Sequence, residues 1–199
     1  MKRTFDAGLA FVGLLLSSPL WILFAAAIKL EDGGPVFFVQ DRVGQDGRVF
    51  RTLKFRSMHD DAERATGPLQ ARAGDSRVTR VGRVMRATAM DELPQLWNIF
   101  RGDMSFVGPR ALRPGEIELE GGTPVPLEAV PGYAERILVR PGLTGVAQVY
   151  AARDISRRSK FRYDRLYIRR RSFALDVRLI LLSFWISFRG TWESRERKY

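Results

Sequence analysis

The chain has 199 residues, a formal net charge of +11 and 45% hydrophobic residues. That apolar content excludes a wholly disordered protein, and the length suffices for one domain with a real core. The absence of cysteine excludes disulfides and cysteine-based metal sites, and the basic charge points to an anionic partner: nucleic acid, an anionic membrane surface or a phosphorylated substrate.

The first predicted element is an apolar segment of 22 uncharged residues, 7–28. A helix of this length would cross a hydrocarbon core of roughly 30 Å. Ser18 and Pro19 lie in its middle, and a proline there removes a main-chain donor and kinks or breaks the helix. Because basic charge flanks the segment on both sides, we expect a re-entrant helix-break-helix, with serine hydroxyls meeting the main-chain groups at the break. The alternatives are a straight spanning helix and a signal peptide cleaved near 25–27.

A β-hairpin is the next predicted element. Glycines and a proline at 33–35 should end the membrane segment. The apolar run 36–39 reads as extended, and the turn signal Asp46-Gly47 precedes the alternating pattern of 49–55. The polar residues 59–76 should form a short helix and a loop.

Two helices should follow. Apolar residues at helical spacing within 77–90 predict a helix with an arginine-rich side. The pattern of 91–100 predicts a second helix with Pro94 in its first turn, where the missing donor matters little. Asp91 and Glu92 then lie at the positive end of the helix dipole, where anions are stabilised. Adjacent acids between an apolar face and a basic strip are suited to bind a cation or attack an electrophile.

The C-terminal half contains four further predicted segments. Residues 121–126 have the composition of an exposed loop. Residues 140–145 cannot form a regular helix, and their glycines would allow close approach of a ligand. The basic and aromatic stretch 157–171 suits an interfacial helix on anionic lipid. The apolar run 179–188 is too short to span a membrane, and both an interfacial and a core helix stay open.

Four blocks stand out together and cover nearly the whole chain. They are the apolar segment interrupted by Ser18-Pro19, KFRSM at 54–58 with DAE at 61–63, DELPQL at 91–96 leading into GDMSFVGPR at 102–110, and RPGLTG at 140–145 with Ala147-Gln148. In this combination the chain resembles the bacterial sugar transferases, the small monotopic polyprenyl-phosphate phosphoglycosyl transferases. Two positions depart from the family pattern, Ala111 and Val146, and neither removes a group that the reaction requires.

The resemblance implies an α/β, predominantly helical, membrane-embedded monotopic fold. Residues 1–32 would form the re-entrant membrane helix. Residues 33–199 would form a catalytic domain on the cytoplasmic face of the bacterial inner membrane, with a small β-hairpin and amphipathic interfacial helices.

The resemblance also implies an activity. Members transfer a sugar-1-phosphate from a UDP-sugar to polyprenyl (undecaprenyl) phosphate and release UMP, which is the first membrane step of surface glycan assembly. Asp91 matches the family's nucleophile, which carries a covalent phosphosugar in a ping-pong reaction. Glu92 matches the glutamate that assists acid/base work, and Mg²⁺ binds at this pair.

The remaining site residues are expected to hold the substrates. Lys54 and Arg86 match positions where the family keeps basic residues and would clamp substrate phosphates, with Arg110 and Arg140 as secondary candidates. The glycine-rich loop should shape the nucleotide-sugar pocket through Pro141, Gly142, Thr144, Gly145 and Gln148.

Two rival readings come from other functional classes. A non-enzymatic basic membrane-surface adaptor would explain the charge and the apolar segment, but not the block around Asp91. A nucleic-acid binder would explain the charge but not the apolar segment, so we expect no nucleic-acid partner. The expected partners are a UDP-sugar, polyprenyl phosphate and an anionic phospholipid membrane. The transferred sugar and the oligomeric state stay open, with a homodimer as one alternative.

Overall fold

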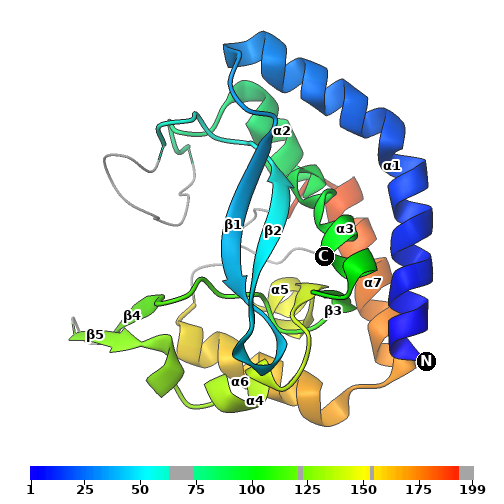
Figure 1. Ribbon diagram of the computed structural model, residues 1–199. Helices are drawn as coiled ribbons and strands as arrows, with labels where there is room; N and C mark the ends of the chain where they lie inside the picture. The colour runs from blue at the N-terminus through cyan, green and yellow to red at the C-terminus, as the bar shows by residue number, and fades with distance from the viewer. Residues whose placement is uncertain (63–73, 121–122, 153–154, 193–199) are drawn as a thin grey trace.

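Helices dominate the computed structural model, which describes residues 1–62, 74–120, 123–152 and 155–192 (Figure 1). The α-helices are α1 (Lys2–Asp32), α2 (Arg80–Ala87), α3 (Gln95–Arg101), α4 (Tyr133–Ile137), α5 (Val146–Tyr150), α6 (Arg157–Arg170) and α7 (Phe173–Phe188). The strands are β1 (Phe37–Val43), β2 (Val49–Phe55), β3 (Ser105–Val107), β4 (Ile117–Glu120), β5 (Thr123–Pro126) and β6 (Gly142–Thr144). Short 3-10 turns are η1 (Gln45–Gly47), η2 (Met90–Glu92) and η3 (Leu127–Ala129). The predicted helix-rich α/β class is confirmed.

Helix α1 is one continuous helix with Pro19 inside it, so the prediction of two helices separated by a break is wrong. The helix bends instead (Figure 1). Pro19 has no N–H to donate to the carbonyl of Leu15, and the Ser18 hydroxyl donates to that carbonyl at 2.8 Å. The expectation that a serine hydroxyl meets the freed main-chain group is therefore confirmed for Ser18. A re-entrant path through a leaflet stays a prediction.

The N-terminal part of α1 packs into the main hydrophobic core, where Ala10 is fully buried. Asp6 is also buried, and its two carboxylate oxygens accept hydrogen bonds from the Ser105 hydroxyl at 2.8 Å and from the Phe106 N–H at 3.3 Å. At the other end of α1, the carboxylate of Glu31 accepts from the first main-chain N–H groups of α2. The helix is therefore tied to the rest of the chain at both ends.

Between these ends, α1 presents an apolar surface to the outside. Its large exposed apolar side chains are Phe11, Val12, Leu15, Leu16, Ile22, Leu23 and Leu30. Within the described residues, α1 is the one helix whose length and composition would allow it to cross a membrane. The helix indicates membrane association, as predicted.

The predicted β-hairpin is confirmed. Strands β1 and β2 pair antiparallel, with Val43 opposite Val49, and the turn includes Asp46 in a left-handed conformation. Asn98 of α3 holds this hairpin, because its amide donates to the Arg51 carbonyl at 2.7 Å and accepts from the Leu53 N–H at 3.1 Å. The hairpin is thus fixed against the helix that follows the acidic pair.

Strands β3 and β6 pair parallel at the centre of the molecule, and glycines make this pairing possible. A Cβ atom on Gly142 would lie 2.0 Å from the main-chain nitrogen of Gly108. The prediction that glycines in 140–145 leave room for a ligand is therefore wrong for Gly142, because the protein's own main chain fills that space.

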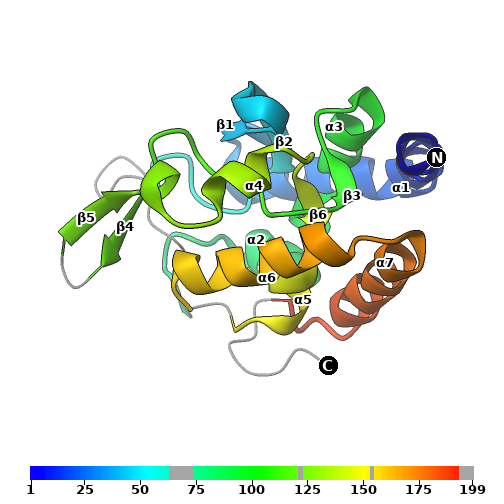
Figure 2. The same ribbon diagram turned by 90° about the horizontal axis from the view of Figure 1, so that it is seen from below.

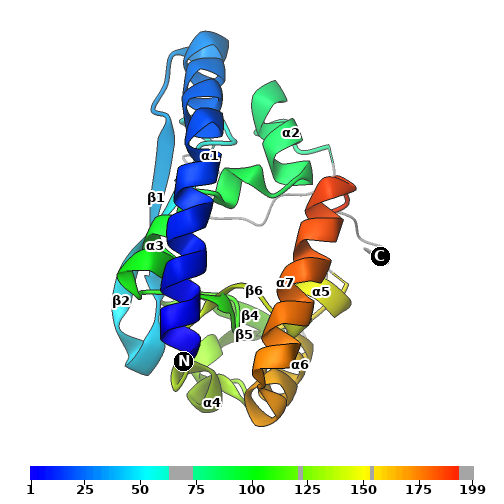
Figure 3. The ribbon, with the colours of Figure 1, turned by 90° about the vertical axis from the view of Figure 1, so that its right-hand side faces the viewer.

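In the C-terminal half, the predicted loop is wrong for residues 123–126, and the structure shows which face of α7 is buried. Residues 123–126, expected in a loop, form strand β5, which pairs with β4. Residues 121–122 lie outside the described part of the chain, and so do residues 63–73 of the loop predicted at 59–76. Helix α7 buries Leu179 and Ile186 in the core and exposes Phe184, Trp185 and Phe188 on its other side. It therefore has both a core face and an exposed apolar face. Its N-terminal end meets that of α1, where Lys2 pairs with Asp176 at 2.6 Å (Figure 3).

Replacing Gly82 by alanine tests the close packing of α2. A Cβ there would lie 2.0 Å from the main-chain oxygen of Ser57, so we expect Gly82→Ala to lower the free energy of unfolding by about 1–3 kcal/mol, although alanine favours helices. Gly8→Ala is the matched control, since no atom lies within 4 Å of its Cβ position. Thermal unfolding in detergent would contradict the packing argument if the two variants were equally stable.

Candidate active site

A cavity of about 670 Å³ lies among η2, the segment after β3, and helices α5 and α6. Its volume falls within the roughly 300–1,000 Å³ usual for ligand pockets. Basic side chains outnumber acidic ones among the described residues that line it: Arg42, Lys54, Arg86, Arg110, Arg113, Arg136, Arg157 and Lys160. Its acidic lining residues are Asp91, Glu92, Glu116 and Asp164. A predominantly basic cavity of this size suits an anionic ligand with several phosphate oxygens.

The acidic pair reaches the cavity on the 3-10 turn η2, and not in the first turn of an α-helix as predicted. Ala89 just before the turn has a φ of 56°, a left-handed conformation that is uncommon for a residue with a side chain. Helix α3 begins only at Gln95, after Pro94. The chain therefore makes a sharp turn at Ala89, and Asp91 and Glu92 both line the cavity while remaining largely buried.

Glu92 is held as a carboxylate by two basic side chains. The Lys54 ammonium donates a hydrogen bond to Glu92, and the Arg110 guanidinium lies 3.7 Å from the same carboxylate oxygen. Burial raises the pKa of Glu92, but Lys54 and Arg110 outweigh burial and lower it to about 2. Glu92 is therefore ionised at neutral pH and has no proton to donate.

The cavity brings together Asp91, Glu92 and four of the predicted substrate-binding residues: Lys54, Arg86, Arg110 and Gln148. Arg86 comes from the last turn of α2, and its guanidinium contacts the Ser57 hydroxyl at 3.5 Å. Of the expected arginine strip in 77–90, Arg86 is the member that lines the cavity.

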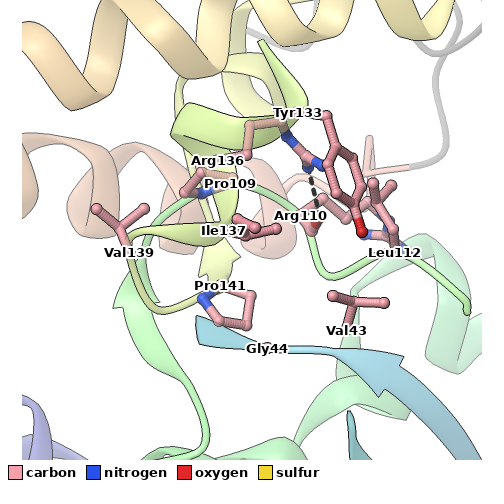
Figure 4. Close-up of a pocket in the computed structure, with 10 residues that line it drawn as sticks. All are labelled: Val43, Gly44, Pro109, Arg110, Leu112, Tyr133, Arg136, Ile137, Val139 and Pro141. Atoms are coloured by element: carbon pink, nitrogen blue, oxygen red, sulfur yellow. Dashed lines mark hydrogen bonds between the residues drawn. The ribbon is translucent and has the colours of Figure 1, made fainter. Parts of the chain in front are cut away.

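The other predicted residues lie elsewhere. Arg140 donates to the Gly102 carbonyl at 3.0 Å and does not line the cavity. Pro141 lines a separate small cavity, shown in Figure 4. Gly142, Thr144 and Gly145 are buried in or beside strand β6, and none of the three lines either cavity. The cavities therefore give no support to the prediction that Gly142, Thr144 and Gly145 contact a nucleotide-sugar.

Several lining residues were not predicted as site residues. Arg42 belongs to the hairpin, and Arg113 follows the Gly108–Arg110 motif. Arg157 and Lys160 lie in the basic stretch that was expected on the membrane surface, yet both line the cavity from α6. The clustering of arginines before and within α6 was the available signal, but it does not reveal which side of the helix faces the cavity.

The carboxylates at the cavity fit a divalent cation that takes further ligands from a substrate. Within the described part of the chain, no group of three or more His, Asp or Glu residues is arranged to hold a metal by itself. Mg²⁺ in phosphoryl-transfer sites typically binds one or two carboxylates together with substrate phosphates. Asp91 and Glu92 supply carboxylates of this kind.

Comparison with known proteins places this geometry in context. The family model described as bacterial sugar transferase matches residues 1–190. The chain is 43% identical over 183 residues to a UDP-N-acetylgalactosamine-undecaprenyl-phosphate N-acetylgalactosaminephosphotransferase of Aeromonas hydrophila, with 90% of this chain and 42% of the relative covered. It is 42% identical over 189 residues to an undecaprenyl-phosphate glucose phosphotransferase of Komagataeibacter xylinus, with 92% and 35% covered.

A third relative is more fully covered. It is a UDP-glucose:undecaprenyl-phosphate glucose-1-phosphate transferase of Caulobacter vibrioides, 43% identical over 187 residues, with 90% of this chain and 67% of the relative covered. The chain thus spans less than half the length of the first two relatives.

The low pKa of Glu92 predicts a pH dependence of stability. A carboxyl group whose pKa is lowered from 4.5 to about 2 on folding stabilises the native state above pH 4.5, and this stabilisation is lost as the pH falls toward 2. Glu92→Gln should therefore be less stable than wild type at neutral pH, and the difference should shrink between pH 4.5 and 2. Denaturant unfolding across this range measures it, with the exposed Glu128→Gln as the control. If the stability difference between wild type and Glu92→Gln did not vary with pH, the lowered pKa of Glu92 would be contradicted.

Proposed function

The chain belongs to the bacterial sugar transferase family, and from this premise we propose that it transfers a sugar-1-phosphate from a UDP-sugar to polyprenyl phosphate, releasing UMP. The observation that carries the proposal is the cavity in which Asp91 and Glu92 lie among Lys54, Arg86 and Arg110. A carboxylate attacks a phosphoryl group only if cations neutralise the charge on that group, and this cavity supplies the cations.

In the first proposed step, a carboxylate oxygen of Asp91 attacks the β-phosphorus of the UDP-sugar. The bond from that phosphorus to the oxygen bridging the α-phosphate breaks, and UMP leaves with the bridging oxygen. In the second step, a phosphate oxygen of the polyprenyl phosphate attacks the same phosphorus and displaces Asp91. Polyprenyl-diphospho-sugar is released, and the carboxylate is regenerated.

Glu92 has a narrower role in this scheme than general acid/base catalysis. With a pKa of about 2 it is ionised throughout the neutral range, so it does not donate a proton and is a weak base. We assign it to holding the Lys54 ammonium in place and to contributing a carboxylate oxygen to a bound Mg²⁺. Bound Mg²⁺ would neutralise charge on the substrate phosphates.

The membrane side of the proposal rests on α1 and α7. Both expose large apolar side chains, and the basic helix α6 suits contact with anionic phospholipid. We propose that the bent α1 enters the cytoplasmic leaflet of the bacterial inner membrane and returns, which would place the cavity near the headgroups. One substrate is a lipid and the other is water-soluble, so a site at this interface is accessible to both.

Asparagine at position 91 tests the nucleophile. We expect Asp91→Asn to reduce UMP release at least about a thousand-fold, because an amide does not replace a carboxylate nucleophile. The measurement uses purified protein, Mg²⁺, undecaprenyl phosphate and a panel of radiolabelled UDP-sugars, since relatives of equal identity are named for different sugars.

The control variant is Asp41→Asn, an exposed acid on β1 that does not line the cavity, and it should retain wild-type activity. Full activity of Asp91→Asn would rule out Asp91 as the nucleophile. If wild-type protein binds membranes but releases no UMP with any sugar, the non-enzymatic adaptor is the better account.

Omitting the acceptor tests the ping-pong order. Wild-type protein with UDP-sugar and Mg²⁺ alone should release about one equivalent of UMP and gain the mass of one phosphosugar on Asp91. A chelator added beforehand should suppress both signals. UMP release that strictly requires the lipid acceptor would contradict a covalent intermediate.

A further inference from the structure

The segment Pro109–Leu112 lies between β3 and β4 and carries Arg110 into the cavity beside Glu92. It contains neither helix nor strand, yet each of its four main-chain carbonyls accepts a hydrogen bond from a different residue. The donors are the Gly142 N–H to Pro109 at 2.8 Å, Arg136 Nη2 to Arg110 at 2.7 Å, Arg42 Nη1 to Ala111 at 3.1 Å and the Val43 N–H to Leu112 at 2.8 Å.

Of the two arginine donors, Arg136 is more completely buried than Arg42, with 5% of its surface exposed. Its Nε donates to Asp164 of α6 at 2.8 Å, and its guanidinium carbon lies 4.2 Å from the centre of the Phe161 ring. Figure 4 shows the guanidinium reaching from α4 to the carbonyl of Arg110. One side chain therefore connects α4, α6 and the segment that carries Arg110.

Stability alone is a poor account of this buried ion pair. Apolar residues of similar volume often replace a buried pair without loss of stability, since desolvation offsets the attraction between the charges. What apolar residues do not provide is a donor for the Arg110 carbonyl. Lysine is also a poor substitute, because its compact ammonium lacks the planar fork that directs one donor to Asp164 and another to the carbonyl.

We propose that Arg136 is a positioning residue for the transfer reaction: it fixes the main chain of Arg110 so that the Arg110 guanidinium faces Glu92 and the substrate phosphates. The proposal rests on the proposed function. The Arg110 guanidinium lies 3.7 Å from Glu92, too far for a hydrogen bond, and its side chain is 44% exposed. The pairing with Glu92 alone therefore holds the guanidinium weakly, and the main chain of Arg110 sets the point from which the side chain reaches the cavity.

A double-mutant cycle between Arg136→Lys and Arg110→Met tests this coupling. We expect each single variant to lower kcat/KM for UMP release by roughly ten-fold, because a misplacement of about 1 Å is costly in transfer reactions. If Arg136 acts through Arg110, the double variant should be no more than about two-fold worse than Arg110→Met alone. Losses that multiply to about a hundred-fold would overturn the proposal.

Arg56→Lys provides a matched control for the cycle. Arg56 is equally buried and is paired with Asp32, but it lies outside the cavity lining. Whatever loss Arg56→Lys causes should multiply with that of Arg110→Met, because no hydrogen bond joins it to the segment. Non-additivity of the same size in this control would show that the cycle reports general destabilisation, and the proposal would fail.

A paired apolar replacement separates positioning from folding. Arg136→Met/Asp164→Leu leaves no buried charge unpaired, so it should remain folded by thermal unfolding, while kcat/KM falls about as far as in Arg136→Lys. Amide hydrogen exchange at Val43 and Gly142, whose N–H groups donate to the carbonyls of this segment, should become faster in both variants. A stable double replacement with wild-type kcat/KM or unchanged exchange would overturn the proposal.

The exchange measurement also separates this proposal from the proposed function. If wild-type protein releases no UMP, the proposed function fails, and exchange at Val43 and Gly142 in the Arg136 variants still decides whether Arg136 holds the segment.

Discussion

A largely buried carboxylate such as that of Glu92 remains ionised at the edge of an apolar core only if basic side chains reach it. In this protein those side chains come from distant parts of the sequence: Lys54 from the hairpin and Arg110 from the segment after β3. Removing one partner from a buried charge typically costs several kcal/mol. The hairpin, the turn η2 and the segment carrying Arg110 must therefore all be in place before Glu92 has both of its basic partners.

The lower face of the molecule shows how this assembly is supported (Figure 2). Helices α4 and α6 lie side by side there, and the Arg136–Asp164 pair, which also lines the cavity, joins them. Strand β6 pairs with β3 so closely that Gly142 and Gly108 touch through their main chains. The segment that carries Arg110 is thus supported both by a buried ion pair and by close main-chain packing.

Features that depend on neighbouring residues could be predicted from the sequence. The hairpin turn at Asp46 and the end of α1 near Gly33 follow from local main-chain preferences. Pro19 was expected to break α1, but the helix continues through it with a bend. Strand β5 could not be predicted, because two prolines favour a loop; they are tolerated because each strand of a two-stranded sheet has a free edge.

The site residues also fall into those that the sequence could predict and those that it could not. Asp91, Glu92 and Lys54 were predicted as site residues because they stand in recognisable blocks of sequence, and all three line the cavity. The role of Arg136 and the packing of Gly142 depend on which segments meet in space, and β3 and β6 meet across more than thirty intervening residues. The attachment of α1 at both Asp6 and Glu31 has one further consequence. If α1 lies in the leaflet as proposed, the depth of α1 in the leaflet also sets the height of the cavity above the lipid headgroups. Because both ends of the helix are attached to the rest of the protein, a thicker or thinner leaflet would change that height.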